Sequence, residues 1–290
     1  MSQSQFLGSF DAPLLIFGGP YGNRHALDAL LAAAETHGIP ATHMLCTGDL
    51  AAYAAEPQAV ADRIRDAGIA VVMGNVEESL GADAGDCGCG FTSGSECDVM
   101  AAHWYRYAAE AVDQETKRWM RDLPRRIDLS LNDVPLAAIH GGVDQINRFV
   151  FPATPVSEKA AELDIADVDM VIGGHSGLPF TETIGHRLWH NSGVIGLPAN
   201  DGTPRVWYSL LTPQAAGITV ELRALSYDHA GAAAAIRAAD LPQAYADALE
   251  SGFWPNDDIM PDTDRRRRGV ALTEQTLLWS QPCQAIAAAE

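Results

Sequence analysis

Short apolar runs alternate with helical patterns along the first quarter of the chain. The run at 12–17 predicts a buried strand, and after a Gly-Gly-Pro turn Asn23 can cap a helix that extends to His37. The next segments predict a strand, a helix and a strand, at 42–47, 57–67 and 69–73. This alternation predicts an α/β fold in which helices pack on the faces of a sheet.

The remainder of the chain predicts further strands separated by less regular segments. Residues 78–97 are rich in glycine and are expected to form a loop, and a helical pattern follows at 99–123. Later apolar runs predict strands at 135–139, 168–172, 187–190, 205–211 and 218–225. A helix pair is expected from about residue 230 onward. We divide the chain into a domain of residues 1–250, with a Gly- and Cys-rich insertion at 78–98, and a C-terminal extension of residues 251–290.

Four of the predicted strands are followed directly by a residue type that binds metals. The four pairs are Gly48-Asp49, Gly74-Asn75, His140-Gly141 and Gly174-His175. One carboxylate, one amide oxygen and two imidazoles suit a single transition metal, for which Zn, Fe or Mn are candidates. Because α/β sheets place their binding crevices at the carboxyl ends of strands, we expect these four side chains to meet there.

The acidic charge balance limits the partners of the chain. Its 19 basic and 38 acidic residues give a net charge of −19 and an isoelectric point near 4.7. Such a field repels nucleic acids and anionic membranes, so neither is an expected partner. An anionic substrate would therefore depend on a local positive source, such as a metal. The amino terminus lacks the features of a secretory signal and no apolar run approaches a bilayer span, so a cytoplasmic location is expected.

The order and spacing of the motifs resemble the calcineurin-like metallophosphoesterases, in particular small bacterial phosphodiesterases and dinucleoside-polyphosphate hydrolases. That family has the motifs D-x-H-G-N, G-D, G-N-H-D/E, H-G and G-H-x-H. The corresponding segments here are GPYGN at 19–23, GD at 48–49, GNVE at 74–77, HG at 140–141 and GHSG at 174–177. The resemblance covers roughly residues 12–250. It implies a two-sheet β-sandwich flanked by helices and a hydrolase that acts on a small phosphorylated molecule, a phosphate mono- or diester.

The resemblance also implies a pair of metals, of which this chain keeps the ligands for only one. Other residues stand at three of the four positions that hold one of the metals: Gly19, Tyr21 and Gly177. The set for the other metal is complete: Asp49, Asn75, His140 and His175. The histidine of G-N-H, which acts as a general acid in the family, is Val76 here. The resemblance therefore implies a single retained metal site and the loss of a proton donor.

Several residues near these motifs could add chemistry. Tyr21 could bind metal or substrate through its hydroxyl, or its ring could fill the vacated volume. Glu77 could supply a replacement ligand or a general acid, or remain an exposed carboxylate. Arg148 could contact a phosphate or pack on the surface. The candidate catalytic residues are thus Asp49, His140, Tyr21 and Glu77.

Three cysteines in the glycine-rich segment allow three interpretations. Cys87, Cys89 and Cys97 could hold an additional Zn with a fourth ligand from elsewhere. Cys97 could instead form a disulfide with Cys87 or Cys89, or all three could be free thiols. The position after G-N-V-E suggests that this loop folds over the metal site.

Three functional hypotheses follow from the sequence. The first is a phosphoesterase-like hydrolase that uses one divalent or trivalent metal. The second is a catalytically silent metal- or ligand-binding protein on the same scaffold. The third is a rebuilt site with Tyr, Glu or Cys ligands and different chemistry. The arginines at 265–268 could pair with the acidic surface of a second subunit, so a homo-oligomer is also allowed.

Overall fold

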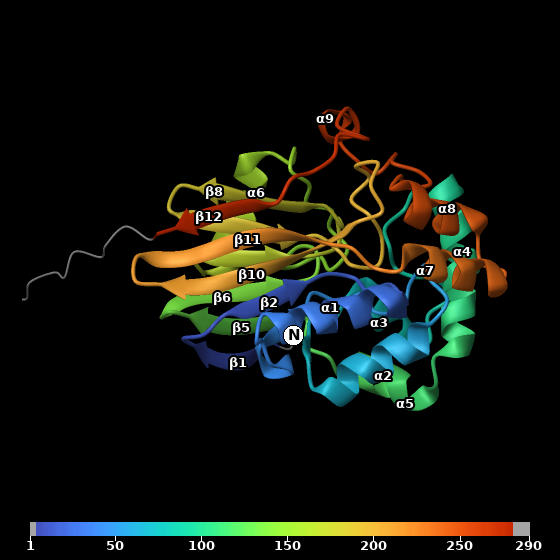
Figure 1. Ribbon diagram of the computed structural model, residues 1–290, viewed down its shortest axis with the longest axis horizontal. Coiled ribbons are helices and arrows are strands. Elements are labelled where there is room, and N and C mark those ends of the chain that lie inside the picture. The colour runs from blue at the N-terminus through green and yellow to red at the C-terminus, as the bar shows by residue number, and fades with distance from the viewer. Residues whose placement is uncertain (1–3, 281–290) are drawn as a thin grey trace, which may run out of the picture.

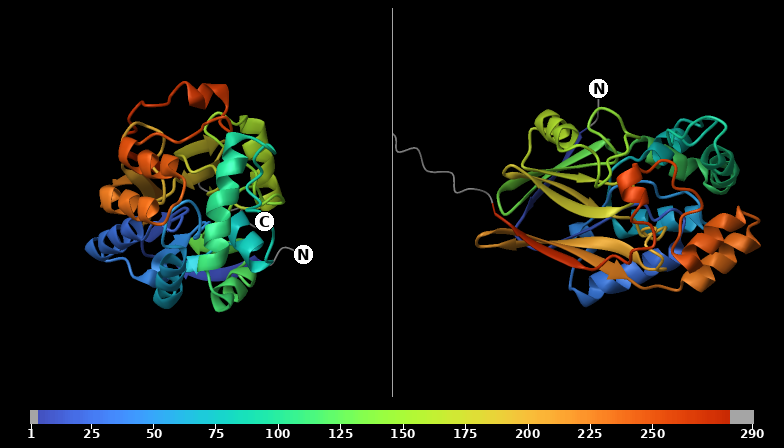
Figure 2. Two further views of the ribbon diagram at one scale, coloured as in Figure 1. Left: turned by 90° about the vertical axis from the view of Figure 1, so that its right-hand side faces the viewer. Right: turned by 90° about the horizontal axis from the view of Figure 1, so that it is seen from above.

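Two six-stranded β-sheets face each other in the computed structural model, which describes residues 4–280 (Figures 1 and 2). Sheet A contains, in spatial order, β1 (Ser4–Phe10), β5 (Arg126–Leu131), β6 (Val134–Ile139), β7 (Met170–Gly173), β9 (Arg187–Ser192) and β8 (Pro179–Ile184). Sheet B contains β12 (Gln275–Trp279), β11 (Gly217–Leu225), β10 (Val206–Gln214), β2 (Leu14–Phe17), β3 (Met44–Cys46) and β4 (Ala70–Val71). Both sheets mix parallel and antiparallel pairs. The predicted two-sheet sandwich is confirmed.

Strand β2 shows why the central strands are continuously apolar. Its side chains alternate in direction, so Leu14 and Ile16 pack between the two sheets while Leu15 and Phe17 pack against the helices. Both faces of the strand are therefore buried, and no position on it is left for a polar residue.

Helices pack on the outer faces of both sheets and also gather at one end of the sandwich (Figure 1). The helices that share a core with sheet B are α1 (Arg24–Thr36), α2 (Pro57–Ala67), α3 (Asn75–Gly81), α4 (Glu96–Ala111), α5 (Gln114–Arg121), α7 (His229–Ala238) and α8 (Gln243–Ser251). On sheet A, α6 (Val156–Ala166) packs on the outer face. The short α9 (Asp262–Arg265) lies in the C-terminal extension.

Two of the predicted elements differ from the structure. The helix expected at 99–123 is two helices, because Asp113 caps α5 by accepting a hydrogen bond from the Thr116 amide. The loop expected at 78–97 begins only after α3, whose first turn carries the metal-ligand candidate Asn75. The loop therefore begins close to the candidate site, directly after α3, and ends where α4 begins.

The C-terminal extension packs on the same body as the rest of the chain. Strand β12 pairs with β11, and Trp254 and Met260 share a core with Phe151 and Trp207. The boundary at residue 250 remains a prediction, and residues 281–290 of the extension lie outside the described residues. Within residues 4–280, none of the helices combines the length and apolarity needed to cross a bilayer.

Candidate metal centre

Four side chains converge on one point at the carboxyl ends of strands from both sheets. The centre of the group is His140 Nε2, which lies 3.2 Å from Asp49 Oδ2, 3.0 Å from Asn75 Oδ1 and 3.0 Å from His175 Nδ1. All four residues are buried. Among the described residues, Asp49, His140 and His175 form the one group of His, Cys, Asp and Glu side chains with ligand atoms close enough to hold a metal.

The orientation of the His140 ring decides which of its nitrogens faces the Asp49, Asn75 and His175 atoms. Its Nδ1 donates a hydrogen bond to the Thr47 carbonyl at 2.6 Å, which leaves Nε2 directed at the other three atoms. Burial disfavours a charged His140, but the adjacent Asp49 carboxylate raises its pKa, so either a proton on Nε2 or a metal cation can relieve the repulsion among these four atoms. Metal bonds of about 2.1 Å at tetrahedral or octahedral angles separate neighbouring ligand atoms by about 3.0–3.4 Å. The residues present therefore fit a divalent metal.

The two outer ligands have the charge states that a metal prefers. Burial and the neighbouring His140 lower the pKa of His175 to about 3, so its imidazole stays neutral. Its Nε2 is buried and has no hydrogen-bond partner among the described residues. Burial disfavours a charged Asp49, but the adjacent His140 outweighs burial and lowers the pKa of that carboxyl. A carboxylate and a neutral imidazole are both ready to bind a cation.

Backbone geometry places the Asp49 carboxylate. Asp49 adopts a left-handed conformation with φ of 61°, which is costly for a residue with a side chain. Gly74 allows the close approach, because a Cβ there would lie 2.3 Å from Asp49 Oδ1. The Val76 amide donates to the same oxygen at 3.2 Å. The surrounding chain thus overcomes the local strain and fixes the ligand.

Glu77 holds this turn together instead of joining the ligands. Its carboxylate accepts hydrogen bonds from the amides of Asp49 at 2.7 Å, Leu50 at 2.7 Å and Gly74 at 2.9 Å. The side chain is fully buried, and burial raises its pKa to about 7. The sequence interpretation of Glu77 as an exposed carboxylate is therefore wrong. The ligand and general-acid roles find no support in these contacts, since both oxygens are already used by the backbone.

Removing the Glu77 carboxylate should destabilise the protein. We expect Glu77→Ala to lower the free energy of unfolding by roughly 3 kcal/mol or more, because three buried amides lose their acceptor at about 1–3 kcal/mol each. Glu77→Gln keeps one acceptor oxygen and should cost less. The control is Glu78→Ala, whose half-exposed side chain pairs with Arg125 at the surface and should change stability by less than about 1 kcal/mol. Urea unfolding measures all three variants, and equal values for Glu77→Ala and Glu78→Ala would refute this role.

The cysteine loop contacts the metal-ligand candidate Asn75. Its side-chain Nδ2 donates to the Cys87 carbonyl at 2.8 Å and to Cys89 Sγ at 3.6 Å, which turns Oδ1 toward His140. Cys87 and Cys89 form a disulfide with each other, and Cys97 is free. The alternative in which Cys97 forms a disulfide with Cys87 or Cys89 is therefore not borne out. A three-thiolate zinc site is not formed either, because the disulfide uses two of the sulfurs.

The Tyr21 ring fills the half of the site that lacks metal ligands. A Cβ at Gly19 would lie 2.3 Å from Tyr21 Cε1 and 2.5 Å from Cζ, so the Tyr21 ring occupies the space into which a longer residue 19 would project. Tyr21 is buried and packs edge-on against Tyr53 with ring centroids 4.8 Å apart. Burial raises the pKa of its hydroxyl well above the usual value, so the hydroxyl remains protonated. Of the alternatives for Tyr21, these contacts favour the filling of volume.

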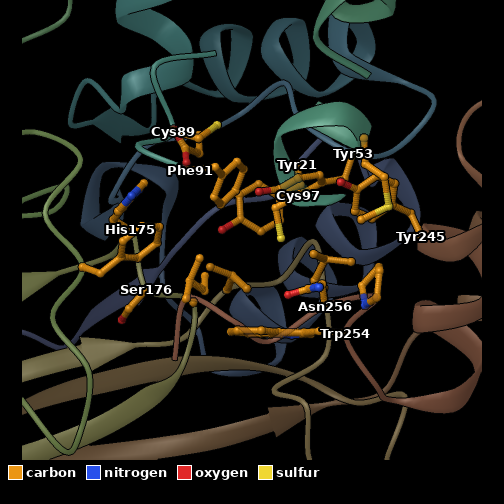
Figure 3. A pocket seen from close by; sticks show the side chains of 18 residues that line it. Tyr21, Tyr53, Cys89, Phe91, Cys97, His175, Ser176, Tyr245, Trp254 and Asn256 are labelled. Atoms are coloured by element: carbon orange, nitrogen blue, oxygen red, sulfur yellow. The ribbon is translucent and has the colours of Figure 1, made fainter. Parts of the chain in front are cut away.

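A pocket that is partly open to solvent lies beside the candidate ligands. Asp49 and His175 line it from the metal side, and Gly177 also contributes. Tyr21 and Cys89 line it as well (Figure 3). Its six aromatic residues come from separate segments: Tyr21, Tyr53, Phe91, Phe149, Tyr245 and Trp254. Apart from Tyr21, none of these was predicted from the sequence. The one available signal was an aromatic residue close to a motif, such as Phe149 after His140-Gly141.

Arg148 is engaged elsewhere. It forms ion pairs with Glu158 at 2.7 Å and Glu162 at 2.8 Å, so its interpretation as a phosphate contact is not supported. Val76, at the position of the expected proton donor, is buried and apolar.

Comparisons with known proteins agree with this architecture. A family model described as the calcineurin-like phosphoesterase superfamily domain matches residues 22–214. No curated protein sequence matches the chain. The fold is similar to that of a metallophosphoesterase from Sphaerobacter thermophilus, with a TM-score of 0.67 and 21% identity over 84% of this chain and 100% of that chain. It is also similar to a hypothetical protein from Pyrococcus horikoshii, with a TM-score of 0.70 and 18% identity over 83% of this chain and 99% of that chain. At these identities the solved structures bear on the fold alone.

Proposed function

The chain belongs to the calcineurin-like phosphoesterase superfamily, and from this premise we propose that it hydrolyses a phosphate mono- or diester with a single metal. Asp49, Asn75, His140 and His175 would hold that metal. The observation that carries the proposal is the convergence of three acceptor atoms within 3.2 Å of His140 Nε2. Such an arrangement is costly in a buried site unless a proton or a metal cation lies among these atoms.

The residues of the chain orient the ligands and exclude bulk water. Thr47 fixes the His140 ring through its carbonyl, and the cysteine loop fixes Asn75. A divalent cation at this site would polarise a phosphoryl oxygen and lower the pKa of water. The protonated Tyr21 hydroxyl is available to donate to a substrate oxygen in the adjacent pocket.

The missing proton donor limits the substrates. Val76 cannot protonate a leaving alcohol, and the vacated half lacks the ligands that would hold a second cation to stabilise the leaving oxygen. Esters of acidic alcohols, which leave without protonation, should therefore react much faster than simple alkyl esters.

We expect metal-loaded protein to hydrolyse bis(p-nitrophenyl) phosphate and to show a steep dependence of kcat/KM on the pKa of the leaving alcohol. A series of substituted phenyl esters measures this slope. A shallow slope would indicate that a proton donor assists departure, which contradicts the role given to Val76. Absence of turnover with every ester, in protein shown to contain metal, would refute the hydrolase proposal.

The Tyr21 ring, which fills the half of the site without metal ligands, favours one alternative function. A site with one cation, no proton donor and a buried Tyr21 could bind a phosphorylated ligand without hydrolysing it. Tight binding of an ester that is recovered intact after long incubation would support this alternative. A site rebuilt around Glu77 is less well supported, because backbone amides occupy its carboxylate.

A further inference from the structure

We propose that the pocket in the vacated half binds an aromatic substituent of the substrate, so that the substrate is a singly charged phosphodiester bearing an aromatic group and not a polyphosphate. The identity of this ligand as a substrate rests on the proposed function. The binding preference itself rests on the pocket and can be measured without any reaction.

Aromatic rings form opposite walls of the pocket. Figure 3 shows Trp254 on one side and Phe91 and Tyr21 on the other, with His175 and Ser176 at one end. A flat group that enters between these walls would reach the metal centre at its His175 end. This geometry suits a planar ring attached to a phosphate, since aromatic rings pack well against one another in stacked or edge-on arrangements.

The walls are held in place before any ligand binds. Trp254 Nε1 donates to the Pro198 carbonyl at 2.6 Å. Tyr53 packs against Tyr21 and Tyr245 with ring centroids 4.8 Å away in both cases. A pocket fixed in this way needs little reorganisation on binding, which favours affinity.

One aromatic contact joins the pocket to the metal centre. The Phe149 ring lies against the His175 ring, with centroids 4.2 Å apart, and Phe149 is also a lining residue. A ring in the pocket and the candidate ligand His175 therefore share a neighbour. The phosphate of such a ligand would lie within reach of the candidate metal.

The charge of the lining excludes a highly charged ligand. Among the described residues, those that line the pocket include Asp49 but no lysine or arginine. Arg148, the nearby candidate, is paired with Glu158 and Glu162. With a net charge of −19 on the chain, one divalent cation can balance a single phosphate charge but offers little to a chain of phosphates. A phosphodiester with an uncharged substituent fits best.

The pocket is partly open to solvent. The ring could be a simple aryl group or a nucleobase, because both present the same stacking face.

The test compares the binding of two phosphonate monoanions to metal-loaded protein, and each compound is checked for intact recovery after the titration. Calorimetry with phenyl methylphosphonate and methyl methylphosphonate should show at least about tenfold tighter binding of the phenyl compound, since even one methylene group in an apolar pocket is worth roughly tenfold or more. A third titration, with the thymidine ester of methylphosphonate, distinguishes a pocket for an aryl group from a pocket for a nucleobase. Tighter binding of the phenyl or the thymidine compound than of the methyl compound supports the proposal. If neither binds more tightly than the methyl compound, the proposal is overturned.

Three variants locate the effect. Trp254→Ala should reduce the phenyl preference to within about threefold of methyl. Because Trp254 also packs in the core, Ile259→Asp offers a second test that places a carboxylate at a half-buried lining position and should have the same effect. The control is Phe253→Ala, which removes a neighbouring ring that contacts Arg268 outside the pocket and should leave the preference unchanged.

The outcomes separate this inference from the proposed function. A phenyl preference that Trp254→Ala and Ile259→Asp abolish supports the pocket even if no ester is ever hydrolysed. Turnover of bis(p-nitrophenyl) phosphate, together with equal binding of the two phosphonates, would overturn the pocket and leave the hydrolase intact. A preference that survives in both variants would also overturn it.

Discussion

Replacing His140 with alanine should remove the metal and lower phosphodiester hydrolysis by about 1,000-fold or more. His140 Nε2 is the atom that the other three candidate ligands surround, at 3.0–3.2 Å. A bound cation contributes several kcal/mol to stabilisation of the transition state, and each 1.36 kcal/mol corresponds to about tenfold in rate. Elemental analysis and kcat/KM for an activated diester measure both effects on the same preparation.

A second buried histidine provides the matched control. His190 bonds to Thr181 and Ser209 at 2.9 Å each and belongs to no candidate metal group among residues 4–280. We expect His190→Gln to retain the metal content of the parent protein. If His140→Ala also retained metal and activity, the assignment of the ligand set would be wrong.

Adding one methyl group at Gly19 should destabilise the protein, and removing the Tyr21 ring should relieve much of that cost. The new Cβ would lie 2.3 Å from the ring, a distance that side chains do not tolerate. Overpacking of this kind costs about 1–3 kcal/mol. In a Tyr21→Ala background the space is free, so Gly19→Ala should there cost less by at least about 1 kcal/mol.

Urea unfolding of the parent, both single variants and the double variant gives this coupling energy. The control is Gly85→Ala, where an added Cβ meets no atom within 4 Å and stability should change by less than about 0.5 kcal/mol. Additive effects of Gly19→Ala and Tyr21→Ala would show that the ring does not occupy the vacated half.

The parts of the fold that sequence reasoning predicts are those where pattern and burial agree. Strands such as β6 and β7 are apolar runs that end at a polar motif, so both the strand and its ligand could be identified. Helix α6 could not be predicted, because its buried face carries Lys159 and Glu162. These charges are neutralised by Glu182 and Arg148, which are distant in sequence. No local pattern can show such pairing.

The same reason limits what could be said of the site. The four candidate ligands follow strands whose ends must meet, so their convergence was predictable. The pocket was not, because its walls depend on how the cysteine loop and the C-terminal extension fold back over the sheets. Tyr21 lies between these cases: its motif position was visible, but its contact with Gly19 needed three-dimensional structure.

The central claim is that one metal binds among Asp49, Asn75, His140 and His175 while the Tyr21 ring fills the place of a second. A crystal structure of metal-loaded protein, with anomalous scattering data at the absorption edge of the metal, tests it most directly. We predict a single anomalous peak in contact with those four side chains and none beside Tyr21 and Gly19. Two peaks in the site, or one peak that these residues do not contact, would contradict the account.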